Sequence, residues 1–276
     1  MVLDVIGAIV GMFGMLLALI DDNDYLFEYD GKSIMSPSSL GRIARYFVSL
    51  STAVLIITIS IRAVVLFKFK YQGRYVKNEC FLFCKQKGAF YNLELMVCLV
   101  HPLPGIYHNF TVTTDFSGSI TYSITSIFAL LMLLRVYLLL RVASSISKWT
   151  GYKAQIAGKK ENSGISPTSH FFTIKCFIEE RPVAFLVLSF CLTVFMVAIT
   201  IRACELPLYI ETLSQDGHQD FINFWNAVWL VIVTMTTVGF GDFYSRTHFG
   251  RLVTALVALA GIFMMSMVIM VINQQF

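Results

Sequence analysis

The stretch Thr234-Met235-Thr236-Thr237-Val238-Gly239-Phe240-Gly241-Asp242 decides how this chain folds. Its two glycines alternate with Val238 and Phe240, and glycine adopts a positive φ without steric cost. Such a backbone leaves ordinary helix and strand geometry, so that successive carbonyl groups face one axis. Val238 and Phe240 then point away from that axis and pack behind it. We therefore expect a turn lined by main-chain oxygen atoms.

The composition places this turn in a membrane protein. Of the 276 residues, 57% are hydrophobic and 14% are charged, and the mean hydropathy is +0.71. Ordinary soluble domains contain about 25% charged residues. The net charge of +4 does not indicate a nucleic-acid partner, because the basic residues gather in particular loops. A lipid bilayer is the expected solvent for this chain.

Six apolar segments recur along the chain, and several approach the length of about 20 residues that a helix needs to cross a bilayer, although the first and third are shorter. They cover residues 5–20, 47–67, 91–103, 119–142, 183–201 and 249–272. A shorter apolar run, residues 221–235, fits a re-entrant helix better than a full span. The predicted fold class is an all-α membrane protein with six transmembrane helices, a re-entrant pore helix and a filter turn.

The same pattern predicts three parts of the chain. Residues 1–146 form a four-helix domain, residues 147–181 form a cytoplasmic linker, and residues 182–276 form a pore domain. Glycine, proline and serine make the linker irregular near residues 158–167, and a helix is expected over residues 169–180.

The distribution of charge predicts the orientation in the membrane. Lys and Arg concentrate between the second and third spans and between the fourth and fifth, whereas the first loop is acidic. The positive-inside rule places both basic loops, and both termini, in the cytoplasm. The sequon Asn109-Phe110-Thr111 then lies outside, as glycosylation would require. The plasma membrane is the expected residence.

The chemistry of the glycine turn indicates potassium. A potassium ion entering a narrow pore must exchange its hydration water for other oxygen atoms, and rings of backbone carbonyls supply them. We assign the ion-binding filter to Thr237, Val238, Gly239, Phe240 and Gly241, with K⁺ held at the first four of these. One turn supplies one quarter of each ring, so the sequence predicts a homotetramer.

The run before the filter is expected to support it. Residues 223–235 should form a helix whose C-terminal dipole end favours a cation. Trp229 is placed to donate its indole N–H to Asp242 and hold the filter open. The alternative is that Trp229 is an aromatic residue of the membrane interface.

These motifs resemble known families. Residues 233–261 look like the pore of potassium channels, and Gly261 falls where many of them have a hinge glycine in the inner helix. The whole chain resembles the small- and intermediate-conductance calcium-activated potassium channels. The segments that carry this likeness are Leu93–Gly105, with its His-Pro-x-Pro-Gly signature, Arg135–Leu138, and Ile201–Glu205, with its Arg-x-Cys-Glu signature.

The resemblance implies gating by intracellular calcium through calmodulin. In that family calmodulin contacts the linker, here residues 147–180, and a region that follows the sixth helix and is not present in this sequence. The sequence contains no EF-hand loop, so a partner must sense calcium. The filter departs from the family's usual Ser-Ile-Gly-Tyr-Gly, because Phe240 lacks the hydroxyl group that bonds behind the filter.

The sixth span predicts a gate. Ile262, Met265, Ile269 and Asn273 follow a 3-4-4 spacing and share one helix face. The offset of this face from Gly261 suggests that it lines the pore, where Met265 and Ile269 form a hydrophobic constriction. The alternative is that these residues pack against the fifth helix.

The fourth span predicts little response to voltage. It carries only Arg135 and Arg141, whereas voltage sensors use 3–4 charges per subunit. Six residues separate the two arginines, which places them on different faces, and Arg141 is expected to snorkel to the cytoplasmic surface.

Other functions stay open at this point. The chain is expected to be a channel opened by calcium, by voltage or by another ligand, or a non-conducting regulatory subunit of a heteromeric channel. An enzyme is not expected, because no acid/base or nucleophilic residues are grouped.

Overall fold

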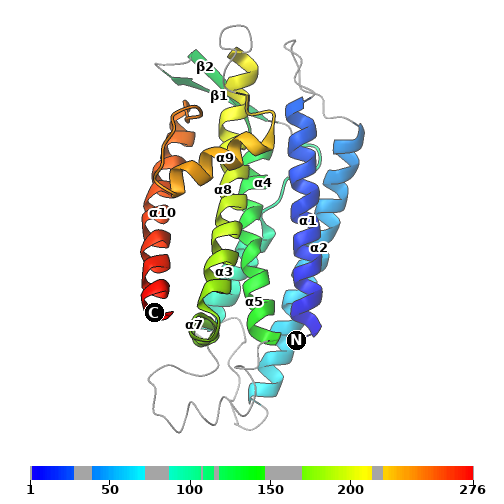
Figure 1. Cartoon of the computed structure of the whole chain (residues 1–276). Coiled ribbons are helices and arrows are strands. Elements are labelled where there is room, and N and C mark those ends of the chain that lie inside the picture. Colours follow the sequence, from blue (N-terminus) through cyan, green and yellow to red (C-terminus); the bar gives the residue numbers. More distant parts are fainter. Residues whose placement is uncertain are drawn as a thin grey trace. The chain divides into compact units, whose positions relative to one another are not determined.

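The structure is a computed structural model that describes residues 2–27, 39–71, 87–106, 108–114, 118–146, 170–212 and 220–275 (Figure 1). It is mainly helical, as predicted. Five helices in this part of the chain are long and apolar enough to cross a membrane. They cover Val2–Asp22, Gly41–Val65, Ile124–Ile146, Pro182–Tyr209 and His248–Asn273.

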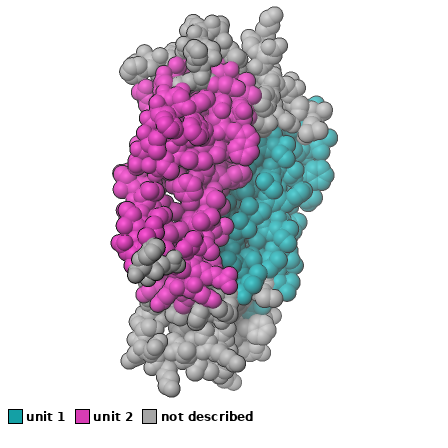
Figure 2. All heavy atoms as spheres, in the orientation of Figure 1, with its two compact units in different colours: residues 1–28, 34–107, 127–170 teal, residues 29–33, 108–126, 171–276 magenta. Residues whose placement is uncertain are grey.

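The chain divides into two compact units, which Figure 2 shows in different colours. Unit 1 contains residues 1–28, 34–107 and 127–170, and unit 2 contains residues 29–33, 108–126 and 171–276. The boundaries predicted at residues 146 and 182 stay predictions. Unit 2 contains a segment from residues 108–126 in addition to the predicted pore residues.

Unit 1 is a bundle of helices. Its elements are α1 (Val2–Phe27), α2 (Ser39–Tyr71), α3 (Lys87–Leu99), most of α4 (Ile124–Met132), the 3₁₀ turn η2 (Leu133–Val136) and α5 (Tyr137–Ile146). Ala8, Leu55, Ile59, Cys98 and Leu138 form a buried apolar cluster that joins four of these elements. Close packing of such side chains stabilises a membrane bundle through van der Waals contacts.

The third predicted span ends earlier than expected. It corresponds to α3, whose 13 described residues end at Leu99 rather than at residue 103. Pro102 and Pro104 follow closely, and proline disfavours helical geometry in the residue before it and lacks an N–H donor.

Buried charges hold unit 1 together, which the sequence did not predict. Arg141 is buried and pairs with Asp4, at 3.2 Å, and with Glu94. Asp4 also pairs with Arg62. The prediction that Arg141 snorkels to the surface is therefore wrong: carboxylates on α1 and α3 provide its counter-charges inside the bundle.

Arg135 is also inside the bundle. Its Nη2 atom donates to the carbonyl oxygens of Cys98, at 2.8 Å, and Val100, at 3.0 Å, at the end of α3. Arg135 belongs to η2, and a 3₁₀ helix turns further per residue than an α-helix. This tighter turn brings Arg135 and Arg141 nearer to one face than a regular helix would, and both are buried.

Unit 2 contains the helices of the predicted pore domain and most of the linker helix. The pore-domain helices are α8 (Pro182–Thr212), α9 (Phe224–Met235) and α10 (His248–Gln275), and the linker helix is α7 (His170–Glu180). The linker helix expected over residues 169–180 is confirmed as α7, and the linker residues 147–169 lie outside the described part. The re-entrant helix is confirmed as α9, a short helix that contacts both α8 and α10 (Figure 1).

Unit 2 also contains a β-hairpin that the sequence reading missed. Strands β1 (Asn109–Thr114) and β2 (Gly118–Ser123) pair antiparallel, with Asn109 opposite Ser123. The fourth predicted span was thus wrong at its start, because residues 119–123 form a strand and the helix begins at Ile124. Ile120, Thr121 and Tyr122 favour a strand, and this segment is less apolar than the helix that follows it.

Candidate functional site

The site begins with the short helix α9. Asn223 caps its first turn, since the Asn223 side chain accepts a hydrogen bond from the Trp225 N–H at 3.1 Å. The cap satisfies one of the free N–H groups at the helix start. Leu230, Val231 and Met235 are buried along α9. The helix ends at Met235, and the filter turn follows directly in the chain.

The filter backbone has the unusual geometry that the sequence predicted. Gly239 has φ of 61° and Gly241 has φ of 78°. Thr237 also has a positive φ, 61°, which the sequence did not predict and which a β-branched residue rarely adopts. Positive φ at alternate residues turns successive carbonyl groups toward one side, whereas a regular strand points them alternately to opposite sides. The backbone is therefore built as a row of oxygen atoms.

The last turn of α9 holds the base of this row. The Val233 carbonyl accepts hydrogen bonds from Val238 N, at 3.1 Å, and from Gly239 N, at 3.3 Å. The Thr234 carbonyl accepts from Thr237 N at 3.1 Å. These bonds point the N–H groups back into the helix, which leaves the filter carbonyls available for another partner.

Trp229 supports the outer end of the filter. Its Nε1 atom donates to Asp242 Oδ2 at 2.7 Å, as the sequence reading predicted. The Trp229 ring also stacks on Phe240, with ring centroids 5.7 Å apart and planes 8° from parallel. Phe240 is nevertheless 65% exposed in the single chain, and Val238 is exposed as well. One α9 side chain thus contacts both the filter and the residue that follows it.

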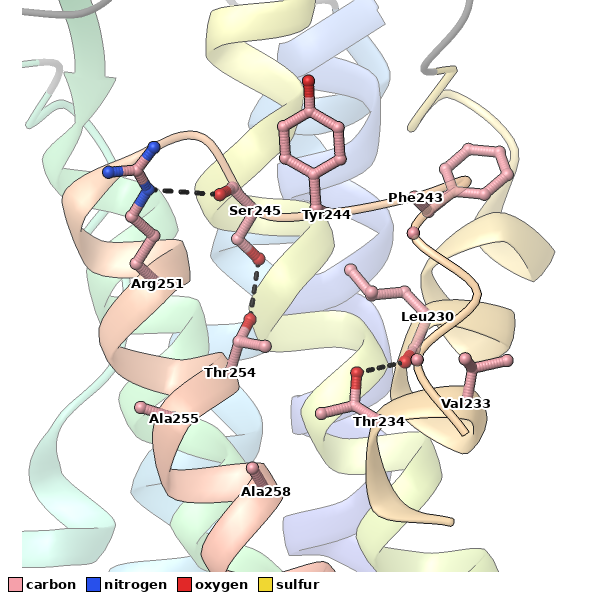
Figure 3. Close-up of a pocket in the computed structure, with 12 residues that line it drawn as sticks. Leu230, Val233, Thr234, Phe243, Tyr244, Ser245, Arg251, Thr254, Ala255 and Ala258 are labelled. Atoms are coloured by element: carbon pink, nitrogen blue, oxygen red, sulfur yellow. Dashed lines mark hydrogen bonds between the residues drawn. The ribbon is translucent and has the colours of Figure 1, made fainter. Parts of the chain in front are cut away.

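The segment after the filter is fixed to α10. Ser245 Oγ and Thr254 Oγ1 form a hydrogen bond of 2.7 Å, and Arg251 Nε donates to the Ser245 carbonyl (Figure 3). Between this segment, α9 and α10 lies a cavity of about 390 Å³. Gly239 and Gly241 contribute to its wall. Figure 3 shows α9 on one side of the cavity and α10 on the other.

A buried glutamate ties α8 to the same segment. Glu205 is 2% exposed, and its carboxylate accepts hydrogen bonds from Arg246 N at 3.1 Å, Thr247 N at 3.1 Å and Thr247 Oγ1 at 2.8 Å. A side chain at position 250 would collide with the Glu205 carboxylate, so Gly250 makes room for it. Glu205 therefore caps the start of α10, where a negative charge is favoured.

Glu205 has no predicted role beyond its place in the Arg-x-Cys-Glu signature. A carboxylate inside a long apolar helix is energetically costly and usually has a specific partner. The position of Glu205 in such a segment therefore indicates from the sequence that it has a partner.

The hairpin of β1 and β2 packs against α8 and α10 close to Glu205. Tyr122 donates its hydroxyl hydrogen to the Cys204 carbonyl at 3.3 Å, one residue before Glu205. The Tyr122 ring meets Phe249 edge-on, with centroids 5.8 Å apart. Ile120, Tyr122 and Leu208 form a buried cluster. The hairpin thus contacts both α8 and the first turn of α10.

The predicted gate residues lie together on α10. Ile262, Met265, Ile269 and Asn273 are all exposed in the single chain. This exposure favours a face directed at a pore or a neighbouring chain over packing against α8, and the assignment of these residues to a gate stays a prediction. Gly261, the predicted hinge, is buried beside this face.

Comparison with known proteins agrees with this geometry. Residues 183–276 match the family model described as ion channel. The chain is 23% identical over 282 residues to a small conductance calcium-activated potassium channel protein of Drosophila melanogaster. That match covers 97% of this chain and 28% of the relative, so the chain spans little more than a quarter of the relative's length. The chain is therefore a helical membrane protein whose residues 183–276 resemble an ion channel domain, and which as a whole is similar to a small conductance calcium-activated potassium channel protein.

Proposed function

We propose that four copies of this chain form a potassium-selective channel that intracellular calcium opens through calmodulin, with little dependence on voltage. The observation that carries this proposal is the positive φ at Thr237, Gly239 and Gly241. A backbone of this kind is strained at Thr237, and strain persists where function requires the geometry.

In this proposal the filter replaces the hydration shell of K⁺. The carbonyls of Thr237, Val238, Gly239 and Phe240, together with the Thr237 hydroxyl, coordinate the ion, and Gly241 completes the turn. Trp229 and Asp242 keep the turn open through the 2.7 Å hydrogen bond. The C-terminal end of α9 carries the negative end of the helix dipole, which favours a cation in the pore beside the filter.

The homotetramer follows from the same geometry. One chain offers a single row of carbonyls, and a closed ring around an ion needs four of them. The exposed side chains of Val238 and Phe240, and the cavity beside Gly239 and Gly241, are surfaces that neighbouring copies are expected to cover.

The gate is proposed on α10. Bending at Gly261 would move Ile262, Met265, Ile269 and Asn273 toward or away from the pore axis. Met265 and Ile269 close the pore by excluding water from a narrow apolar passage.

Calcium control rests on the relatives. The Drosophila relative is a calcium-activated potassium channel protein by its name. We assign calcium sensing to calmodulin bound at the linker of residues 147–180, of which the structure describes α7. This partner fits a channel that lies in the plasma membrane and has both termini in the cytoplasm.

Weak voltage dependence is supported by the anchoring of both arginines in unit 1. Arg135 donates to main-chain carbonyls and Arg141 pairs with two carboxylates. A gating charge has to change its position in the membrane field, whereas these groups would have to leave buried partners to move.

The test is a current recording from excised patches of cells that express this chain alone. Reversal potentials are measured in mixed Na⁺ and K⁺ while internal calcium is stepped, with and without added calmodulin. We expect a K⁺-selective current that appears with calcium and needs calmodulin. Current opened by voltage at fixed calcium would favour another gating stimulus. Absence of current, with surface expression verified, would favour a non-conducting regulatory subunit.

A further inference from the structure

Gly261 lies on α10 next to Met235, the last residue of α9. A Cβ atom built at this position would be 2.5 Å from the carbonyl oxygen of Met235, 2.7 Å from its Cα and 2.9 Å from its carbonyl carbon. All three atoms are main-chain atoms, so no rotation of a side chain relieves the overlap. Carbon atoms in ordinary contact lie about 3.5–4.0 Å apart. Only glycine fits in this position without moving one of the two helices.

The end of α9 that Gly261 contacts is the part that holds the filter. Met235 is buried and is the last residue of α9. Two residues earlier, the Val233 carbonyl accepts the hydrogen bonds of Val238 N and Gly239 N. A displacement of the last turn of α9 is therefore passed to the filter through these two bonds.

We propose that Gly261 is a positioning residue for the selectivity filter: its lack of a side chain lets α10 rest directly on the main chain of Met235. This role differs from that of a hinge, since it depends on space beside the glycine rather than on flexibility of the helix. It rests on the proposed function only in assigning ion selectivity to residues 237–241. A movement of α10 at this point changes the filter as well as the gate.

The two roles make different predictions for the variant Gly261→Ala. Alanine is the best helix former and removes flexibility, so the hinge role predicts altered opening with unchanged selectivity and a more stable helix. The contact predicts that α10 and α9 separate by about 1 Å, which is the overlap to be relieved. Selectivity and stability should then both fall.

A second variant moves the glycine by one position. Ala260→Gly combined with Gly261→Ala restores a flexible residue next to the original site but leaves the Cβ atom against Met235. Ala260→Gly alone is the matched control, because it adds flexibility and keeps the contact. All three variants and the wild type are purified as intact channels, reconstituted in liposomes and compared for their K⁺/Na⁺ permeability ratio. Their melting temperatures are measured in K⁺ and in Na⁺.

We expect Gly261→Ala to lower the permeability ratio about tenfold, equivalent to about 1.4 kcal/mol of lost discrimination, and to reduce the stabilisation by K⁺. The double variant should show the same losses, and Ala260→Gly should keep the wild-type ratio. A Gly261→Ala channel with wild-type selectivity and a raised melting temperature would overturn the inference, as would recovery in the double variant. If the wild type itself does not prefer K⁺, the proposed function fails. The melting temperature of Gly261→Ala still tests the contact in that case, because helix propensity alone predicts that it rises.

Discussion

Unit 1 and the filter of unit 2 both place polar groups in apolar surroundings, and they do so with different chemistry. In unit 1 the groups are charged side chains, such as Arg141 with Asp4 and Glu94, and each charge meets its counter-charge inside the protein. In the filter the groups are main-chain carbonyls of residues 237–240, whose N–H groups are partly bound to α9. Paired charges leave nothing for an ion, whereas aligned carbonyl dipoles carry no net charge and can accept one.

The two regions also differ in what their surroundings stabilise: buried ion pairs in unit 1 and a strained backbone in the filter. Unit 1 gains a defined packing from its ion pairs, since removal of one partner leaves the other unpaired in the interior. The filter tolerates positive φ at three positions because α9, Trp229 and Glu205 constrain the residues around it. Four predictions test this difference, beginning with the largest expected effect.

The first prediction concerns the filter glycines. Gly239→Ala places a Cβ atom where φ is 61°, which costs about 1–2 kcal/mol in each copy and recurs four times in a tetramer. We expect loss of K⁺-selective current, measured by reversal potential. Gly105→Ala is the control, because Gly105 also has a positive φ, 89°, but lies outside the filter. If both variants lose selectivity, the filter geometry is not the cause.

The second prediction concerns the ion pairs of unit 1. Arg141→Gln removes the counter-charge of Glu94 and leaves Asp4 paired with Arg62 alone, and breaking a buried pair destabilises a protein by about 3–5 kcal/mol. We expect a lower free energy of unfolding in detergent and an unchanged slope of conductance against voltage. Arg42→Gln, at an exposed position, should change neither. A flatter conductance–voltage curve in Arg141→Gln would show that this arginine is a gating charge.

The third prediction concerns the tie between α8 and α10. Glu205→Gln removes the charge that accepts the N–H groups of Arg246 and Thr247, and hydrogen bonds to a charged group contribute about 1.5–3 kcal/mol. We expect a lower melting temperature and a faster decline of current during sustained opening. Glu179→Gln on the exposed side of α7 is the matched control. Equal decline in both variants would exclude a role for this tie in holding the filter.

The fourth and smallest effect is expected at the filter support. Trp229→Phe removes the hydrogen bond to Asp242 and keeps an aromatic ring against Phe240, so about 1 kcal/mol of support is lost. We expect a modest shortening of channel openings in single-channel records. Trp225→Phe should have no such effect, because Trp225 is 71% exposed on α9. Identical records for both variants would indicate that Trp229 acts only as an interfacial aromatic.

Local features of the pore were predictable because each depends on residues close together in the sequence. The positive φ of Gly239 and Gly241 follows from glycine itself, and the bond between Trp229 and Asp242 spans a single helix and its turn. The hydrophobic segments predicted six spanning helices; five of them are long and apolar enough to cross a membrane among the described residues, and the third corresponds to the shorter α3. In each case the prediction depends on a residue type or on a pattern within one short segment of the chain.

The interactions that were missed join distant parts of the chain. Arg141 pairs with Asp4 and Glu94 on other helices, and Glu205 accepts a hydrogen bond from Thr247 at the start of α10. Nothing near these residues in the sequence identifies their partners. The hairpin was missed for a different reason, since residues 119–123 directly precede the apolar helix α4 and were included in the same predicted span.

The sequence by itself determined that this protein is a helical membrane protein with a glycine-containing turn after a short helix. Hydrophobic length and glycine's conformational freedom are properties of individual residues and short segments, so they can be read without a structure. Only the tertiary structure decided that both arginines of the fourth span are anchored, that Glu205 caps α10, and that Gly261 touches the main chain of Met235. These depend on which helices pack together and how closely, and that depends on the whole set of contacts rather than on any one stretch.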